Sequence, residues 1–285
     1  LAQWWVESGL VEGKAVIKVC SVMGEMPSLA DHEWPPVVRT VVQAAGGRVP
    51  VMGAIHGKDT KRSIDDARRA QDLGAVGLQV SAPIYNDPTQ DDILRYFDAL
   101  SSAIEIGIMV YNTPWMPHGG IETSTFHRMA DFEHVVAIKW CNFPGYDYED
   151  LTGLTGFFNI LDNSNQPGRC YKLGGHGFLD EQATAYPPHE LKVLGLLERG
   201  RHDEGQALWD SVSGPIGEFY ARLAGKSGGS ARVKKGVLSL MGHPVGSMRP
   251  PSEPLSREEM AELRRLLVGL GWPVPEVSRA VSVTA

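Results

Sequence analysis

The run IGIMVYN at residues 106–112, followed by VVAIKW at residues 135–140, decides the predicted fold. Both runs are almost continuously apolar and rich in β-branched residues, which is typical of parallel strands that are covered on both faces. Residues 124–131 between them have helical periodicity. Strands that alternate with helices and short loops predict parallel pairing through right-handed crossovers.

The same alternation extends over most of the chain. Further strands are expected at residues 15–21, 49–55, 76–82 and 157–161, with a weaker seventh candidate at 171–178. From about residue 191 onward the pattern is helical only. The predicted class is α/β: a (β/α)8 TIM barrel over residues 1–190, whose first strand is expected to be missing from the given chain. Residues 191–285 are expected to form a C-terminal helical extension, packed on the barrel in the same structural unit. An open doubly wound sheet is the alternative, although no GxGxxG-like motif follows the first expected strand.

Composition and charge disfavour several classes of partner. With 27 basic and 34 acidic residues the formal net charge is −7, which disfavours nucleic acid and anionic membranes. No apolar run approaches the length of about 18 residues that a membrane span needs. The histidines lack metal-binding spacing, so no metal is expected. Three cysteines without CxxC spacing favour reduced thiols and a cytoplasmic location.

Two strand ends carry side chains suited to covalent chemistry. Active sites of (β/α)8 barrels lie at the carboxyl ends of the strands. Lys139 has apolar neighbours there, and desolvation favours the neutral amine that attacks a ketone to form a Schiff base. Tyr111 ends the preceding strand and is placed to exchange protons with the carbinolamine. The alternatives are a solvent-facing or ion-paired Lys139 and a merely capping Tyr111. Lys18 is a rival amine, because period 2 without a register does not tell which face it takes.

Four motifs in order resemble those of the dihydrodipicolinate synthase/N-acetylneuraminate lyase family of class I, Schiff-base-forming aldolases. They are SVMGEMPSL (21–29), which resembles the family's GTTGE loop; APIYNDPTQDDILRYF (82–97), which resembles TPYYNxPTQ; VYNTP (110–114) with VVAIKW, which resembles the YNxP-to-IK core; and KLGGHGFL (172–179), which resembles the strand-eight motif. The match covers nearly the whole chain, and its spacing is that of the family without gaps.

The resemblance implies roles for individual residues. Lys139 would be the Schiff-base lysine, Tyr111 the acid–base tyrosine, and Tyr85 a tyrosine that reaches into the site of a neighbouring subunit. The protein would then be a homo-oligomer, a dimer or tetramer, that needs no cofactor. The implied substrate-binding positions are Val22, Met23, Gly24, Trp115, Trp140, Gly177 and Leu179.

The chain departs from the family pattern at two places. Val22 and Met23 stand where the family has two threonines, so the hydroxyl that relays protons is absent, although backbone N–H groups could still bind a carboxylate. The arginine expected after YNxP is also absent, because the run there is WMPHGG (115–120). Trp115 and Trp140 instead favour a larger, more aromatic pocket, as in the family's hydratase-aldolase branch.

The predicted activity is therefore that of a Schiff-base lyase acting on pyruvate or another 2-oxo acid, by aldol cleavage, condensation or hydratase-aldolase chemistry. One alternative is a 2-keto-3-deoxy sugar-acid dehydratase that uses the same lysine. The glycine-rich residues 225–236 faintly resemble that branch of the family. Another is a catalytically impaired barrel that binds a 2-oxo acid or a partner protein, suggested by Val22 and Met23.

Overall fold

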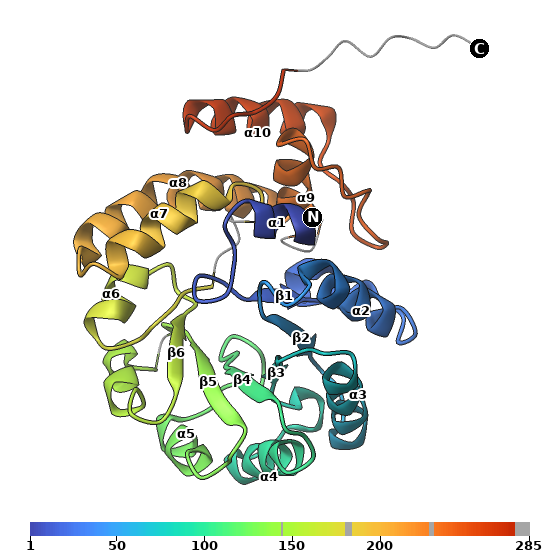
Figure 1. Ribbon diagram of the computed structural model, residues 1–285, viewed down its shortest axis with the longest axis vertical. Helices are drawn as coiled ribbons and strands as arrows, with labels where there is room; N and C mark the ends of the chain where they lie inside the picture. The colour runs from blue at the N-terminus through green and yellow to red at the C-terminus, as the bar shows by residue number, and fades with distance from the viewer. Residues whose placement is uncertain (144, 180–183, 228–230, 277–285) are drawn as a thin grey trace.

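The computed structural model describes residues 1–143, 145–179, 184–227 and 231–276. Its centre is a parallel sheet whose strands follow one another in chain order, as the curved row of arrows in Figure 1 shows. The strands are β1 (Ile17–Val19), β2 (Val51–Ile55), β3 (Gly77–Ser81), β4 (Gly107–Tyr111), β5 (Val135–Trp140) and β6 (Asn159–Asp162). Every neighbouring pair is parallel, so the expected α/β class and strand direction are confirmed.

The expected seventh strand over residues 171–178 is wrong. Tyr171 and Lys172 belong to a helix, α6 (Pro167–Lys172), and Phe178 makes only an isolated parallel bridge with Asp162. Proline at the start of α6 has the φ angle a helix needs and loses no hydrogen bond there. The glycines at 174, 175 and 177 then disfavour an extended strand. The described sheet therefore has six strands instead of the eight of a closed barrel.

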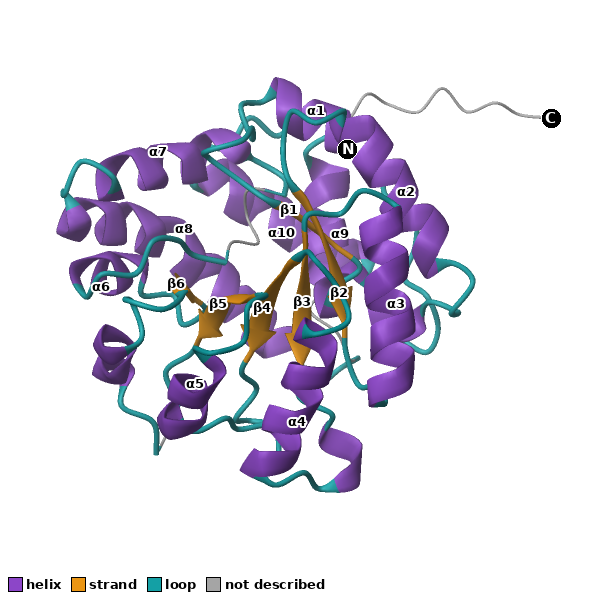
Figure 2. Ribbon diagram, turned by 60° about the horizontal axis from the view of Figure 1, so that its bottom comes forward, coloured by secondary structure: helices purple, strands orange, loops and turns teal. Residues whose placement is uncertain are grey.

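Helices lie outside the sheet, and Figure 2 shows the strands side by side with helices around them. The outer helices are α2 (Trp34–Ala45), α3 (Thr60–Asp72), α4 (Gln90–Ser101), α5 (Thr123–Met129) and α6, while α1 (Ala2–Glu7) precedes β1. Short 3₁₀ helices are η1 (Val22–Gly24), η2 (Met26–Ser28), η3 (Ile84–Asn86) and η4 (Tyr148–Gly153). Local sequence sets the helix starts: the Arg62 N–H donates to the Asp59 carboxylate before α3, and Thr89 with Asp92 forms a capping box at α4.

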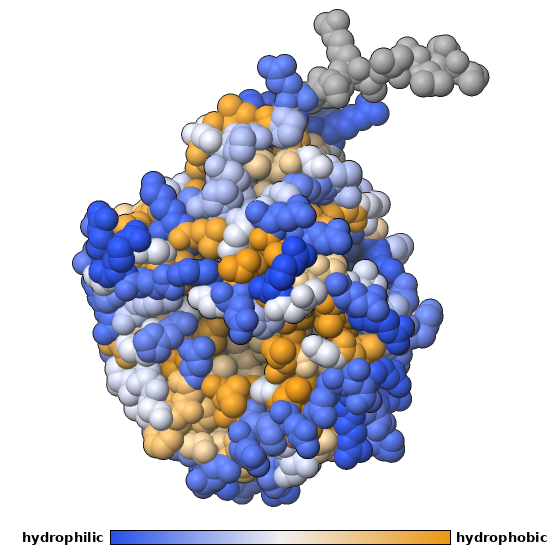
Figure 3. All heavy atoms as spheres, in the orientation of Figure 1, coloured by the Kyte–Doolittle hydropathy of each residue, from blue (hydrophilic) through white to orange (hydrophobic). Residues whose placement is uncertain are grey.

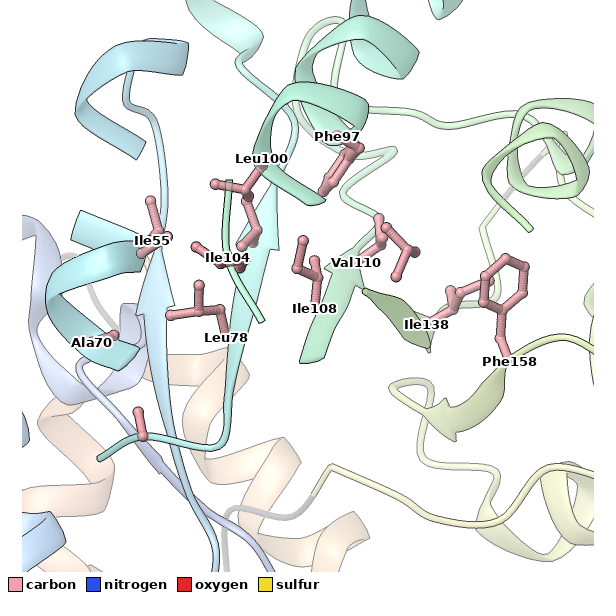
Figure 4. Close-up of a cluster of buried hydrophobic side chains, with 14 of the residues drawn as sticks. Ile55, Ala70, Leu78, Phe97, Leu100, Ile104, Ile108, Val110, Ile138 and Phe158 are labelled. Atoms are coloured by element: carbon pink, nitrogen blue, oxygen red, sulfur yellow. The ribbon is translucent and has the colours of Figure 1, made fainter. Parts of the chain in front are cut away.

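Alternate strand residues form the core between the sheet and this helical layer. Leu78, Ile108 and Ile138 have no exposed surface, and they belong to the same core cluster as Phe97 and Leu100 of α4 (Figure 4). Burying a side chain of this size contributes about 1.5–3 kcal/mol. Because side chains alternate along a strand, the residues between these positions project to the other, interior face.

The C-terminal helices expected from the sequence are present. They are α7 (Pro187–Leu197), α8 (His202–Leu223), α9 (Ala231–Leu240) and α10 (Arg257–Gly269), drawn in yellow to red in Figure 1. A second core cluster joins α8, α9 and α10 through residues such as Phe219 and Leu263, and a third packs Val193 of α7 against Trp209 of α8. The Arg249 guanidinium ties the segment after α9 to Glu33, 2.8 Å away. Within the described ranges, no helix has the length and apolar character needed to cross a bilayer.

Candidate functional site

Lys139 and Tyr111 meet at the carboxyl ends of β5 and β4. The two residues are register partners, and Lys139 pairs in turn with Leu161 of β6, so these side chains share the interior face. Lys139 is 8% exposed, and its Nζ lies 3.8 Å from the centroid of the Tyr111 ring. The structure thus brings the two expected reactive side chains into direct contact in a largely dehydrated position.

Burial and the charge of Lys139 shift the pKa values of two neighbouring side chains, His56 and Cys141. Burial, together with the charges of Lys139 and Lys18, lowers the pKa of His56 to about 3, so the imidazole is neutral at neutral pH. Burial raises the pKa of the Cys141 thiol, and the opposing effect of Lys139 is small enough that the pKa is still about 12. A thiol with so high a pKa is not a nucleophile at neutral pH.

A chain of polar side chains lies beside the lysine–tyrosine pair. Lys18 Nζ donates to Gln79 Oε1 at 2.7 Å, Gln79 Nε2 lies 3.1 Å from His56 Nε2, and His56 Nδ1 lies 3.2 Å from Ser81 Oγ. The His56 ring also lies nearly perpendicular to that of Tyr111, with 5.5 Å between ring centroids. From the sequence, Lys18 is expected only as a rival amine, and neither Gln79 nor Ser81 is expected at the site. Polar residues at i and i+2 of the run GLQVS were the available signal.

The loop after β1 forms the 3₁₀ turn η1. Val22 is 47% exposed, and the N–H groups of Gly24 and Met26 both donate to the Ser21 carbonyl, at 2.9 and 3.2 Å. The Glu25 N–H donates to the Val22 carbonyl at 3.1 Å. Binding of a carboxylate by this loop would therefore depend on the N–H groups of Val22 and Met23.

Glu25 fastens this loop to the C-terminal helices. Its carboxylate accepts from the Arg249 N–H at 2.9 Å and pairs with Lys235 of α9. Burial raises the pKa of Glu25, but the bonds from Arg249 and Lys235 outweigh burial and hold the pKa below its usual value of 4.5. The C-terminal helices thus help to fix the mouth of the site.

The two expected tryptophans have different positions. Trp115 is 44% exposed, and its ring centroid lies 5.9 Å from that of Tyr111 and 6.5 Å from that of Phe143. Trp140 is 1% exposed, and its Nε1 donates to the Tyr148 carbonyl at 3.1 Å. It follows Lys139 on the strand and therefore takes the opposite, helix-covered face. The structure thus corrects the expectation for Trp140 and places it in the core instead of the pocket.

The remaining expected residues lie around the strand ends. Tyr85, in η3, is 96% exposed and is not part of the lysine–tyrosine pair. A Cβ on Gly177 would lie 3.2 Å from the Leu161 side chain, so glycine permits the close approach of this segment to β6. The Leu179 N–H donates to the Asp162 carbonyl at 2.8 Å, which holds Leu179 beside the end of β6.

A cavity of about 240 Å³ adjoins the strand ends. Met23, Asn163 and Leu179 line it from the strand-end loops, and Tyr220 and Lys234 line it from α8 and α9. The face of the molecule in Figure 3 is hollowed near its centre, with hydrophobic residues at the border of the hollow. Lys139 and Tyr111 do not line this cavity, which lies between the strand-end loops and the C-terminal helices.

Neither metal binding nor disulfide formation is indicated in the described parts of the chain. No group of three or more His, Cys, Asp or Glu side chains there could hold a metal ion. Cys20, Cys141 and Cys170 are buried free thiols.

Comparison with known proteins identifies the family. Residues 1–269 match the Dihydrodipicolinate synthetase family. The 4-hydroxy-tetrahydrodipicolinate synthase of Cutibacterium acnes is 30% identical over 249 residues, which cover 86% of this chain and 82% of the relative. The 4-hydroxy-tetrahydrodipicolinate synthase 1 of Halalkalibacterium halodurans is 26% identical over 265 residues, 89% of this chain and 85% of the relative. The chloride-inhibited dihydrodipicolinate synthase of Acinetobacter baumannii, complexed with pyruvate, has the same fold, with a TM-score of 0.82, 22% identity and coverage of 95% and 90% of the two chains. The chain therefore belongs to the Dihydrodipicolinate synthetase family.

Proposed function

We propose that the protein is a Schiff-base lyase acting on pyruvate or another 2-oxo acid. The observation that carries the proposal is the buried Lys139 amine, 3.8 Å from the centroid of the Tyr111 ring at the carboxyl ends of neighbouring strands. Family membership supports the proposal, as does the pyruvate bound to the similar enzyme from Acinetobacter baumannii.

The reaction begins when the neutral Lys139 amine attacks the ketone carbon of the 2-oxo acid. A C–N bond forms, and Tyr111 gives its proton to the former carbonyl oxygen, which yields the carbinolamine. The proton that the nitrogen loses returns to the tyrosine oxygen. A further proton from Tyr111 lets the hydroxyl leave as water and produces the cationic imine. This imine withdraws electrons from the adjacent carbon, so a bond beta to the nitrogen-bearing carbon breaks or forms without a metal or organic cofactor.

The surrounding residues suggest how the substrate is held. We assign its carboxylate to the N–H groups of Val22 and Met23, next to Gly24. The distal part would extend past Trp115 and the segment of Gly177 and Leu179 into the cavity. An aromatic side chain at the border favours an apolar or aromatic second reactant, as in hydratase-aldolases.

The larger assembly is part of the same proposal. The exposed Tyr85 would reach the site of a second subunit in a homodimer or homotetramer. The six strands would form most of a (β/α)8 barrel, with residues 1–190 and 191–285 in one structural unit. The three buried thiols fit a reducing compartment such as the cytoplasm.

A product screen tests the reaction class. The purified protein is incubated with 4-hydroxy-2-oxo acids and with 2-keto-3-deoxy sugar acids, and pyruvate release and water loss are measured separately. We expect pyruvate release, lost in Lys139→Met and retained in the exposed-lysine control Lys192→Met.

Two other outcomes would contradict the lyase. Loss of water without release of pyruvate would indicate the dehydratase. The glycine-rich segment that suggests this alternative includes residues 228–230, which lie outside the described residues. Calorimetric binding of 2-oxo acids without any product would indicate the impaired binding protein.

A further inference from the structure

The direction of the polar chain beside Tyr111 can be derived from the one group in it that only donates. The Lys18 ammonium has no acceptor atom, and it lies 2.7 Å from Gln79 Oε1. The amide oxygen of Gln79 must therefore face Lys18, which turns the amide nitrogen toward His56. The 3.1 Å contact between Gln79 Nε2 and His56 Nε2 agrees with that orientation.

The orientation of the Gln79 amide fixes the tautomer of His56. An amide nitrogen only donates, so His56 Nε2 is the acceptor and the single ring proton is on Nδ1. This proton is donated to Ser81 Oγ at 3.2 Å. Burial, together with the charges of Lys139 and Lys18, lowers the pKa of His56 to about 3, so the ring carries only one proton at neutral pH.

The chain ends on a hydroxyl at the reaction centre. Ser81 is 8% exposed and is the register partner of Tyr111, so the two side chains share the interior face of the sheet. Because Ser81 Oγ accepts from His56, its own proton points away from the imidazole. The His56 and Tyr111 rings are nearly perpendicular, at 74°, with 5.5 Å between their centroids, so the histidine that bonds Ser81 lies beside the tyrosine.

We propose that Ser81 donates a hydrogen bond to the Tyr111 oxygen through one bridging water, and that Lys18, Gln79 and His56 are positioning residues that orient it. The inference rests on the proposed function. When Tyr111 gives its proton to the substrate oxygen, the O–H bond of the phenol breaks and a phenolate remains. Ser81 keeps its proton and stabilises that negative charge. It supplies a hydroxyl that the loop residues Val22 and Met23 lack.

Kinetics of matched variants test the role of Ser81. We expect Ser81→Ala to lower kcat by about 10- to 100-fold, the effect of losing one hydrogen bond to a charged oxygen, with KM changed only a few-fold. Ser81→Thr keeps the hydroxyl and should restore kcat to within a few-fold of the original protein. Unchanged kcat in a folded Ser81→Ala protein, or failure of threonine to restore it, would overturn the proposal.

Nitrogen NMR of the histidines tests the orientation of the chain without any need for turnover. The His56 signals, assigned by their absence in His56→Gln, should show a neutral Nδ1–H ring that does not titrate between about pH 5 and 8. Lys18→Met should abolish this single-tautomer signature, and Lys18→Arg, which also only donates, should preserve it. An Nε2–H ring, or a ring that titrates in this range, would contradict the derived direction.

Borohydride trapping separates this inference from the proposed function. If the proposed function fails, the unaltered protein gives no covalent adduct with any 2-oxo acid. If only the inference fails, the adduct forms and Ser81→Ala turns over at the original rate.

Discussion

The two faces of the parallel sheet differ in what they contribute. On the outer face, Leu78, Ile108 and Ile138 are apolar, fully buried and packed under the helices. On the inner face, the neighbouring positions include Tyr111 and Lys139, in contact with each other. Alternation along the same strands therefore separates stability from chemistry: one set of positions holds the sheet and the other lines the site.

Energetics support this separation. Apolar side chains on the outer face stabilise the fold by their removal from water. Polar groups on the inner face are costly to bury unless they are hydrogen-bonded, and Lys18, Gln79, His56 and Ser81 satisfy one another in sequence. Substitutions on the two faces should therefore affect different measurements.

The largest of the three effects is expected on the inner face. Tyr111→Phe should lower kcat about 10²- to 10⁴-fold, because it removes the acid–base hydroxyl while the ring still packs against Lys139. The midpoint of thermal unfolding should change little. Tyr171→Phe in α6 is the matched control and should leave kcat unchanged. Full activity in the Tyr111→Phe protein would contradict the assignment of proton transfer to Tyr111.

A truncation on the outer face should have the opposite profile. Ile138→Ala should destabilise the protein by about 2–5 kcal/mol in urea unfolding, because a cavity replaces a fully buried side chain. The kcat of the folded protein should stay within a few-fold of the original. The exposed Val136 on the same strand offers a control, since Val136→Thr should cost far less. Equal losses of unfolding free energy at positions 138 and 136 would contradict the placement of Ile138 in the core.

The smallest effect is expected where the C-terminal helices hold the loop after β1. Glu25→Gln should cost about 1 kcal/mol of stability and raise KM for the 2-oxo acid a few-fold, because the loop loses its charged anchor to Lys235. The pKa of Glu25 is lowered in the folded state, so this contribution is fully present above the usual value of 4.5 and is lost as pH falls through the lowered pKa. The free energies of unfolding of the two proteins should therefore converge as the pH falls. A difference that stays constant with pH would contradict the role of Glu25 as a charged anchor.

Much of the sheet could be predicted from apolar runs, because strands covered on both faces need them. The strand expected at residues 135–140 is observed with the same bounds. The run at 171–178 was misleading, since proline starts a helix just before it and glycines follow.

The side on which each residue lies could not be predicted in the same way. In VVAIKW both Lys139 and Trp140 belong to an apolar run, and only the register with β4 and β6 shows which one shares the interior with Tyr111. The contacts among Lys18, Gln79 and His56 join three segments and have no signature in any one of them. The family resemblance supplied the pairing of Lys139 with Tyr111, which spacing alone could not.

The most direct test of the central claim is reduction with borohydride in the presence of pyruvate, followed by peptide mass mapping. We expect a stable adduct on the peptide that contains Lys139, and no adduct when borohydride or pyruvate is omitted. An unmodified Lys139 across a panel of 2-oxo acids, or an adduct on Lys18 in its place, would contradict it.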